Sequence, residues 1–267
     1  MYQGFKLRIS DSEREALLRK CDLAYEPIKA TVGDGDMEKA LQTDNANWIM
    51  DNWFRNYDAD IFMSHSHGDE KLARKVSAIF NEMGLRVFID SDVWGYSDKM
   101  LRKIDNMHCG LKFREDGTVE TYDYNKRNKT TSHVHILLTH ALMRMITQTE
   151  CFIFLETGNS SFRSTKKELD TYSPWLFHEL AFANVVEQQK LLRKRYCCPE
   201  KVAMDESVTE GHESFALKFS ANVEKLRRVS LSNLLERVNV ADGMGDLPTR
   251  REKAERFLDY LYQNWDE

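Results

Sequence analysis

Short apolar runs alternate with stretches of helical periodicity through the middle of the chain. Residues 60–64 and 85–90 are apolar runs that end in polar residues, as short strands do. The apolar side chains between them recur at the spacing of one helical face: Leu72, Val76, Ile79, Phe80 and Met83. Asp69 can cap this helix, and Gly84 stands where a helix commonly ends. The pattern predicts a β-α-β unit with parallel strands and a right-handed crossover.

A third strand and a further helix follow the same scheme. Residues 151–155 are nearly all apolar, which is typical of a buried parallel strand. Ser173 is a favoured N-cap and Pro174 fits the first helical position, so a helix is predicted to begin there. Trp175 and Glu179 then lie one turn apart on the same face. This pairing suits a site that holds a flat base and stabilises a developing positive charge, but a core tryptophan beside a solvated glutamate has the same spacing.

The rest of the sequence predicts helical flanks and one insertion. Residues 1–55 have a polar, helical pattern and are interpreted as an N-terminal extension. Residues 109–131 are predicted to be an insertion, in which Asp116-Gly117 marks the turn of a hairpin. The other predicted elements are a helix over 132–147, a strand at 215–219, a helix over 226–238 and an amphipathic helix over 250–265.

Composition narrows the class of protein. Of the 267 residues, 42% are hydrophobic and 11% are aromatic, so the chain can bury a substantial core. A net charge of −5 gives no electrostatic reason to expect nucleic acid as the main partner. The five cysteines have no metal-ligand spacing and favour a reduced, cytoplasmic compartment. No apolar stretch approaches the roughly 18 residues that span a bilayer, so no membrane partner is expected.

The order of three motifs resembles a TIR (Toll/interleukin-1 receptor) domain of the bacterial type found in antiphage defence. The first motif resembles the family's opening box, the second precedes its BB loop, and the third matches its W-x-x-x-E helix. In this chain they are DIFMSHS at 60–66, Phe88-Ile89-Asp90 before a loop at 91–97, and Trp175-x-x-x-Glu179. The resemblance covers roughly residues 55–195 and continues more weakly to about 240.

This resemblance implies a fold and a division of the chain. The fold expected is α/β, with the central parallel sheet of a flavodoxin-like TIR domain flanked by helices. Residues 56–240 would form the TIR domain, and 1–55 and 241–267 would be helical extensions. The insertion at 109–131 is longer than a minimal TIR domain carries at this place.

The family's activity is the second implication. A free-standing TIR protein with helical flanks is most similar to the TIR subunit of the Thoeris defence system. Such proteins cleave NAD⁺ and make cyclic or otherwise modified ADP-ribose signals for a downstream effector. NAD⁺ would then be the substrate, with no separate cofactor and no metal. Self-association is also implied, because in this family the BB loop of one TIR unit commonly completes the site of the next.

The chemistry of that reaction assigns a role to Glu179. Nicotinamide leaves as a neutral molecule, so the main difficulty is the oxocarbenium-like ribose left behind. A carboxylate near this ribose can accept hydrogen bonds from its hydroxyls and stabilise the growing positive charge. Glu179 is therefore the predicted catalytic residue.

The remaining predicted site residues follow from where ligands bind in parallel sheets, which is at the carboxyl ends of the strands. We expect residues after the first strand to contact ribose or phosphate, and an aromatic residue of the BB loop to stack on a base. The predicted substrate-binding residues are Ser64, His65, Ser66, Asp90, Trp94, Tyr96 and Trp175, the last as a support for the site.

Two other functions remain open at this level. A non-catalytic TIR interaction module would have the same motifs, although such adaptors commonly lack the carboxylate found here at Glu179. A nucleoside deoxyribosyltransferase also uses a carboxylate near ribose, but the order of motifs fits it less well. The sequence has neither a phosphate-binding glycine-rich loop nor a serine nucleophile elbow.

Overall fold

The computed structural model describes most of the chain and divides it into two compact units. The described residues are 3–28, 45–52, 57–89, 92, 101–165, 167–186, 217–243 and 249–263. The first unit contains the main sheet and comprises residues 1–28, 58–89 and 146–267. The second unit comprises residues 29–57 and 90–145.

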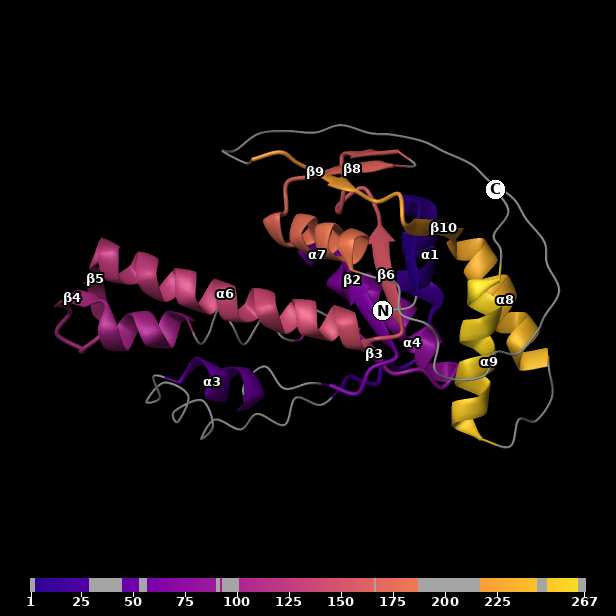
Figure 1. Ribbon diagram of the computed structural model, residues 1–267, viewed down its shortest axis with the longest axis horizontal. Coiled ribbons are helices and arrows are strands. Elements are labelled where there is room, and N and C mark those ends of the chain that lie inside the picture. Colours follow the sequence, from indigo (N-terminus) through magenta and orange to yellow (C-terminus); the bar gives the residue numbers. More distant parts are fainter. Residues whose placement is uncertain are drawn as a thin grey trace. The chain divides into compact units, whose positions relative to one another are not determined.

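A five-stranded parallel sheet forms the centre of the first unit (Figure 1). The strand order is β10-β1-β6-β2-β3, and each neighbouring pair is parallel. The α/β class with a central parallel sheet flanked by helices is therefore confirmed, and the arrangement is compatible with a flavodoxin-like fold. The bounds are β1 Gln3–Arg8, β2 Ile61–Ser64, β3 Val87–Ile89, β6 Cys151–Glu156 and β10 Leu226–Ser230.

The β-α-β unit and the third strand have the predicted structure. Helix α4 (Glu70–Glu82) joins β2 to β3, which pair in parallel. All six residues of β6 are buried, as expected for a strand in the interior of a parallel sheet. Helix α7 (Pro174–Val185) begins at the predicted Pro174 and runs beside the sheet. The carboxyl-terminal amphipathic helix is α9 (Arg250–Tyr262), whose buried face belongs to the main core.

The strand β1 corrects the prediction that the N-terminal residues are only helical. Gln3–Arg8 form a strand between β10 and β6, and α1 (Asp11–Lys20) follows it. Within β1, only Phe5 and Leu7 are large apolar residues. Lys6 lies between them and is nevertheless fully buried. A polar pattern therefore concealed an interior strand.

A second correction concerns residues 215–238. The predicted strand at 215–219 lies further along the chain, as β9 (Phe219–Asn222), and it is antiparallel to its neighbour. The predicted helix over 226–238 begins only at Leu231, where α8 (Leu231–Gly243) starts, because its first residues form β10. The two arginines of β10 interrupt the alternation that would have marked a strand.

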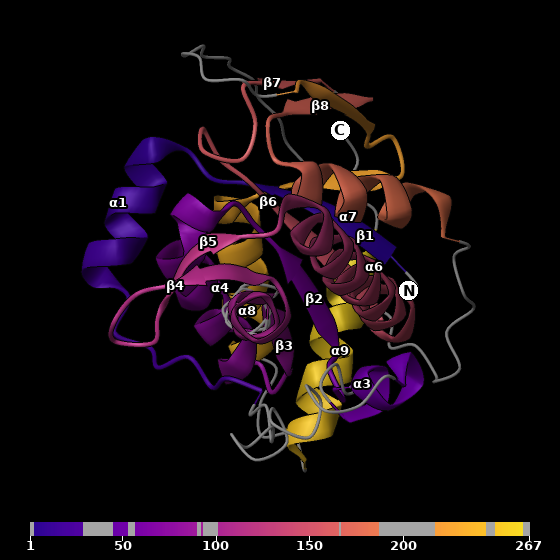
Figure 2. The same ribbon diagram turned by 90° about the vertical axis from the view of Figure 1, so that its left-hand side faces the viewer.

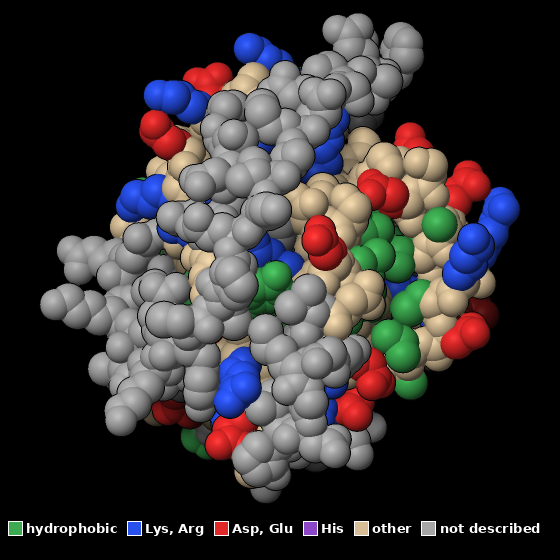
Figure 3. All heavy atoms as spheres, turned by 90° about the vertical axis from the view of Figure 1, so that its right-hand side faces the viewer, with side chains coloured by type: hydrophobic (Ala, Val, Ile, Leu, Met, Phe, Trp, Pro, Cys, Tyr) green, Lys and Arg blue, Asp and Glu red, His purple; other side chains and the backbone are tan. Residues whose placement is uncertain are grey.

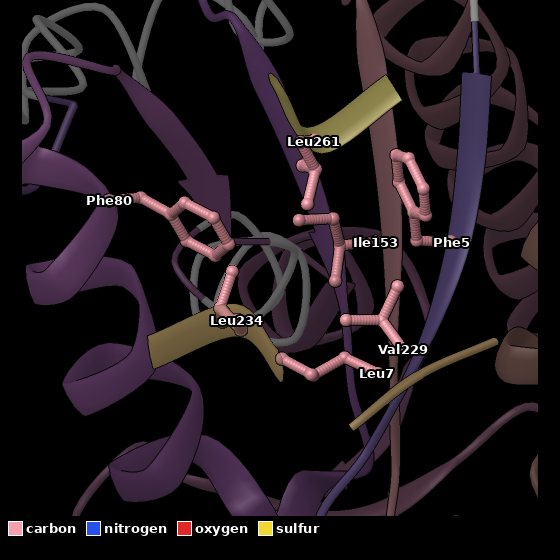
Figure 4. A pocket seen from close by; sticks show the side chains of 7 residues that line it. All are labelled: Phe5, Leu7, Phe80, Ile153, Val229, Leu234 and Leu261. Atoms are coloured by element: carbon pink, nitrogen blue, oxygen red, sulfur yellow. The ribbon is translucent and has the colours of Figure 1, made fainter. Parts of the chain in front are cut away.

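The main hydrophobic core lies on one face of the sheet. Alternate side chains of the strands, such as Leu7, Met63 and Ile153, pack there against α4, α8 and α9. The opposite face carries aromatic side chains, and α7 lies on that side (Figure 1). A small cavity of about 10 Å³ remains between the sheet and helices α4, α8 and α9 (Figure 4). Its lining is entirely apolar: Phe5, Leu7, Phe80, Ile153, Val229, Leu234 and Leu261. A gap of this size and chemistry is a packing defect and cannot bind a polar substrate.

A three-stranded antiparallel sheet covers α7. Its strands are β7 (Arg163–Ser164), β8 (Glu168–Thr171) and β9, with β8 in the middle. Both β8 and β9 contact α7, and Figure 2 shows the small sheet next to that helix. The rings of Phe177 on α7 and Phe219 on β9 stack with their centroids 5.1 Å apart.

The second unit contains the predicted hairpin and most of a long helix. Strands β4 (Gly110–Phe113) and β5 (Val119–Tyr122) are antiparallel, and Gly117 in their turn has a φ of +80°. The hairpin is thus confirmed. Helix α6 (Tyr124–Gln148) begins before the predicted residue 132, so it includes part of the predicted insertion. Helix α3 (Ala46–Asn52) also belongs to this unit.

Gly84 ends α4 in a Schellman motif and has no room for a side chain. Its N–H donates to the carbonyl of Asn81 at 2.8 Å, and the N–H of Leu85 donates to that of Phe80 at 3.0 Å. Its φ is +85°, and a Cβ placed there would lie 2.6 Å from the carbonyl oxygen of Arg250. Both the turn and the approach of α9 therefore require glycine.

Gly84→Ala is expected to lower the free energy of unfolding by at least about 1–2 kcal/mol, the cost of the left-handed backbone conformation alone. The contact with Arg250 adds to this cost. Gly117→Ala is the matched control, because Gly117 has a similar φ of +80° but nothing lies within 4 Å of its added Cβ. Urea unfolding of both variants measures the difference, and equal losses would contradict the proposed clash.

Candidate functional site

The candidate site lies where the connections of two neighbouring strands diverge. From β2 the chain passes through α4 to β3 at one edge of the sheet. After β6 it passes through α7 and later forms β10 at the opposite edge. Strands β2 and β6 are adjacent. Open parallel sheets bind their ligands at such a switch point, outside the carboxyl ends of the strands. The residues that follow β2 and β6 are therefore the first candidates.

Ser64 and Glu179 meet at this point. Ser64 is the last residue of β2, and its Oγ donates a hydrogen bond of 2.6 Å to Oε2 of Glu179. Both residues are 0% exposed. The structure thus brings together the first and third motifs of the sequence analysis, which are 115 residues apart.

The local structure of α7 explains the position of Glu179. The hydroxyl of Ser173 accepts a hydrogen bond from the backbone N–H of Leu176 at 3.2 Å, so the helix is capped as predicted. Leu176, Leu180 and Ala183 are buried with Glu179, at the spacing of one helical face. The carboxylate therefore points from the packed face of α7 toward the sheet.

Trp175 and His178 are less enclosed than Glu179. Each is half-buried, although Trp175 lies only one turn before the carboxylate. Burial lowers the pKa of His178, which favours its neutral form near pH 7. The predicted role of Trp175 as a support for the site stays a prediction.

The other residues predicted after β2 are also enclosed. His65 is 3% exposed and Ser66 is 8% exposed. Ser66 Oγ donates to Oδ2 of Asp69 at 3.2 Å, so its hydroxyl has a partner within the protein. Contacts of Ser64, His65 and Ser66 with a ribose or phosphate would require the surrounding groups to move.

Asp69 is a buried junction that the sequence analysis missed. Its carboxylate is 0% exposed and accepts hydrogen bonds from three segments of the chain. The donors are Ser66 Oγ at 3.2 Å, Thr157 Oγ1 at 2.5 Å, Asn159 Nδ2 at 2.8 Å and Arg14 Nε at 3.2 Å. Asp69 precedes α4 as predicted, but its side chain makes no capping hydrogen bond because these donors occupy it. Asp69 therefore joins the loops after β2 and β6 to α1.

A second missed group is the buried pair of Lys6 and Glu156. Lys6 Nζ lies 3.6 Å from Oε2 of Glu156 and donates to Ser164 Oγ at 3.0 Å and to the carbonyl of Thr165 at 2.9 Å. Burial lowers the pKa of the Lys6 ammonium. The lysine thus fastens the segment around β7 to the sheet.

Register places this pair on the same face of the sheet as Ser64. Lys6 on β1 and Ser64 on β2 both align with Phe154, which lies on β6 between them. Side chains in one row of a parallel sheet point to the same face. Because Lys6 lies in the segment predicted to be helical, no sequence signal connected it with Ser64.

Three predicted substrate-binding residues lie outside the described residues. These are Asp90, Trp94 and Tyr96, which belong to the predicted end of the second strand and to the BB loop. Their assignments stay predictions.

The described residues include neither a metal-ligand cluster nor a membrane-spanning helix. No group of three or more His, Cys, Asp or Glu side chains there could hold a metal ion. None of the described helices is long and apolar enough to cross a bilayer. Over the described surface that bears α8 and α9, basic side chains are interspersed with acidic ones (Figure 3).

The site is thus a buried serine–carboxylate pair at a switch point, flanked by the Asp69 junction and the Lys6–Glu156 pair. Comparisons of the chain with protein-family models, with curated proteins and with solved structures return no match.

Proposed function

We propose that this protein cleaves the nicotinamide–ribose bond of NAD⁺ and makes an ADP-ribose-derived signalling nucleotide, cyclic or otherwise modified, in antiphage immunity. The observation that carries the proposal is the position of Glu179 at the switch point beside β2. Resemblance to the TIR family suggests this reaction, and the contact between the first and third motifs supports it.

Glu179 would stabilise the positive charge that develops on the ribose. As the glycosidic bond breaks, nicotinamide departs with the bonding electron pair and becomes neutral. The anomeric carbon becomes electron-deficient, and a nearby carboxylate lowers the energy of this state. Because Glu179 is buried, its charge would be little screened by water and would act more strongly than on a surface. Water or a hydroxyl group of a nucleotide then attacks the anomeric carbon, which gives a linear, cyclic or conjugated product.

The burial of Glu179 also fits an enzyme with low activity before it is triggered. A catalytic carboxylate has to reach the ribose, and in this structure Glu179 is 0% exposed. The family resemblance implies activation by self-association, and we propose that this self-association makes Glu179 accessible to the substrate. Turnover per subunit should then rise with protein concentration.

A cytoplasmic location completes the proposal. The described cysteines Cys21, Cys109 and Cys151 are free thiols. Free thiols agree with a reducing compartment, where NAD⁺ is available to the enzyme.

The test is to incubate the purified protein with NAD⁺, alone and in lysate from phage-infected cells, and to resolve the products by liquid chromatography and mass spectrometry. Nicotinamide release supports the proposal, and the mass of the second product distinguishes a hydrolase, a cyclase and a transferase. Absence of release under both conditions would overturn the proposal.

The second candidate is a non-catalytic TIR interaction module. The observation that favours it is the same burial, because the Ser64–Glu179 hydrogen bond could serve only to hold α7 on the sheet. In that case Glu179→Gln would alter the free energy of unfolding without any associated enzymatic loss.

A further inference from the structure

The hydroxyl of Ser64 is placed to orient a carboxylate. Its side chain is 0% exposed, and its Oγ lies 2.6 Å from Oε2 of Glu179. This distance is within the normal range for a hydrogen bond from a hydroxyl to a carboxyl oxygen. In this structure, therefore, the residue faces a protein group where the sequence analysis predicted a contact with ribose or phosphate.

Both partners are held by rigid elements. Ser64 ends β2 and aligns with Phe154 of the fully buried strand β6. Glu179 lies on α7, which is capped by Ser173 and packed through Leu176 and Leu180. Serine has only one side-chain torsion to its Oγ, so the donor atom has little freedom to move. The hydrogen bond thus fixes one carboxylate oxygen with respect to the sheet and thereby the plane of the carboxylate.

We propose that Ser64 is a positioning residue, which holds the Glu179 carboxylate in the orientation that stabilises the developing charge on ribose. This inference rests on the proposed function, because it assigns Ser64 a role in the same reaction. A carboxylate that loses this partner can rotate away from the productive geometry. Errors of about 1 Å in the placement of a catalytic group can cost about 10²-fold in rate.

Ser64→Ala is accordingly expected to lower kcat for nicotinamide release about 10- to 100-fold. KM should change less than about twofold, because a residue that contacts no substrate contributes no uniform binding energy. If Ser64 contacted the substrate, its replacement by alanine would instead raise KM. The assay is steady-state nicotinamide release under the conditions in which the wild type is most active.

Two further variants separate the hydrogen bond from packing. Ser77→Ala is the matched control, since Ser77 is also 0% exposed and its hydroxyl has no hydrogen-bond partner among the described residues. It should retain the wild-type kcat. Ser64→Thr keeps a hydroxyl on the same carbon and should recover most of the activity lost in Ser64→Ala. Thermal unfolding of each variant verifies that it is folded before its rate is compared.

Each outcome decides one of the two proposals. No nicotinamide release by the wild type overturns the proposed function and with it the role of Ser64. Wild-type turnover that Ser64→Ala leaves within about twofold overturns the positioning role alone. A raised KM with unchanged kcat assigns Ser64 to substrate binding and also overturns it. If Ser64→Thr is as slow as Ser64→Ala, or Ser77→Ala is equally slow, the loss comes from packing and the inference is wrong.

Discussion

Glu179→Gln is expected to lower kcat for nicotinamide release about 10²–10³-fold, which is the usual effect of removing one electrostatic group that stabilises a transition state. Glutamine keeps the shape of the side chain, and its amide oxygen can still accept the hydrogen bond from Ser64. The variant therefore removes the negative charge while it retains the packing. Single-turnover and steady-state assays of nicotinamide release measure the loss.

The control for this prediction is Glu168→Gln, which neutralises an exposed carboxylate on β8 of the same unit. It should leave kcat unchanged, because a solvated charge on the small sheet does not contact the reacting atoms. Equal turnover by the wild type and Glu179→Gln would place the chemistry on a different residue. Denaturant unfolding of Glu179→Gln shows whether any loss reflects instability instead.

Asp69→Ala should reduce the free energy of unfolding by about 3 kcal/mol, near the lower end for breaking a buried ion pair. The substitution leaves the hydroxyls of Ser66 and Thr157 and the amide of Asn159 without their acceptor. Unpaired buried donors are costly, whereas the Arg14 side chain is 32% exposed and can regain water. For this reason the upper end of the range is not expected.

The matched comparison for Asp69 is Glu15→Ala, which removes a carboxylate paired with Arg19 on the surface of α1. Pairs of this kind contribute at most about 1 kcal/mol, because water screens the charges. Urea unfolding of both variants at the same pH measures the contrast. A loss for Asp69→Ala no larger than that for Glu15→Ala would show that the junction does not hold the loops together.

Local patterns predicted the elements whose stability is local. The helical face from Leu72 to Met83, the cap at Ser173 and the turn at Gly117 each depend on residues a few positions apart. Periodicity and capping rules describe such elements well. The same rules also predicted that a helix begins at Pro174 and that Glu179 lies one turn after Trp175, whereas the burial of Glu179 was not predicted.

The contacts that complete the site could not be predicted in this way. Asp69 is 88 residues from Thr157 and 55 from Arg14, so no spacing along the chain relates them. Lys6 was a misleading signal, because a lysine between apolar residues usually lies on the solvent-exposed face of an element. In this protein, Lys6 is buried with Glu156. Both groups depend on polar side chains that are far apart in the sequence, which local patterns do not describe.

The central place of β1 has a consequence for the order in which this protein can fold. Gly4 pairs with Leu226 on one side and with Phe152 on the other, so a strand from the start of the chain joins two strands made much later. During synthesis, β1 emerges long before either partner exists. The pair of β2 and β3 can form early, whereas the five-stranded sheet is complete only after β10 has left the ribosome. Removing residues 3–8 would therefore separate β10 from β6 and leave each of these strands with an unpaired edge.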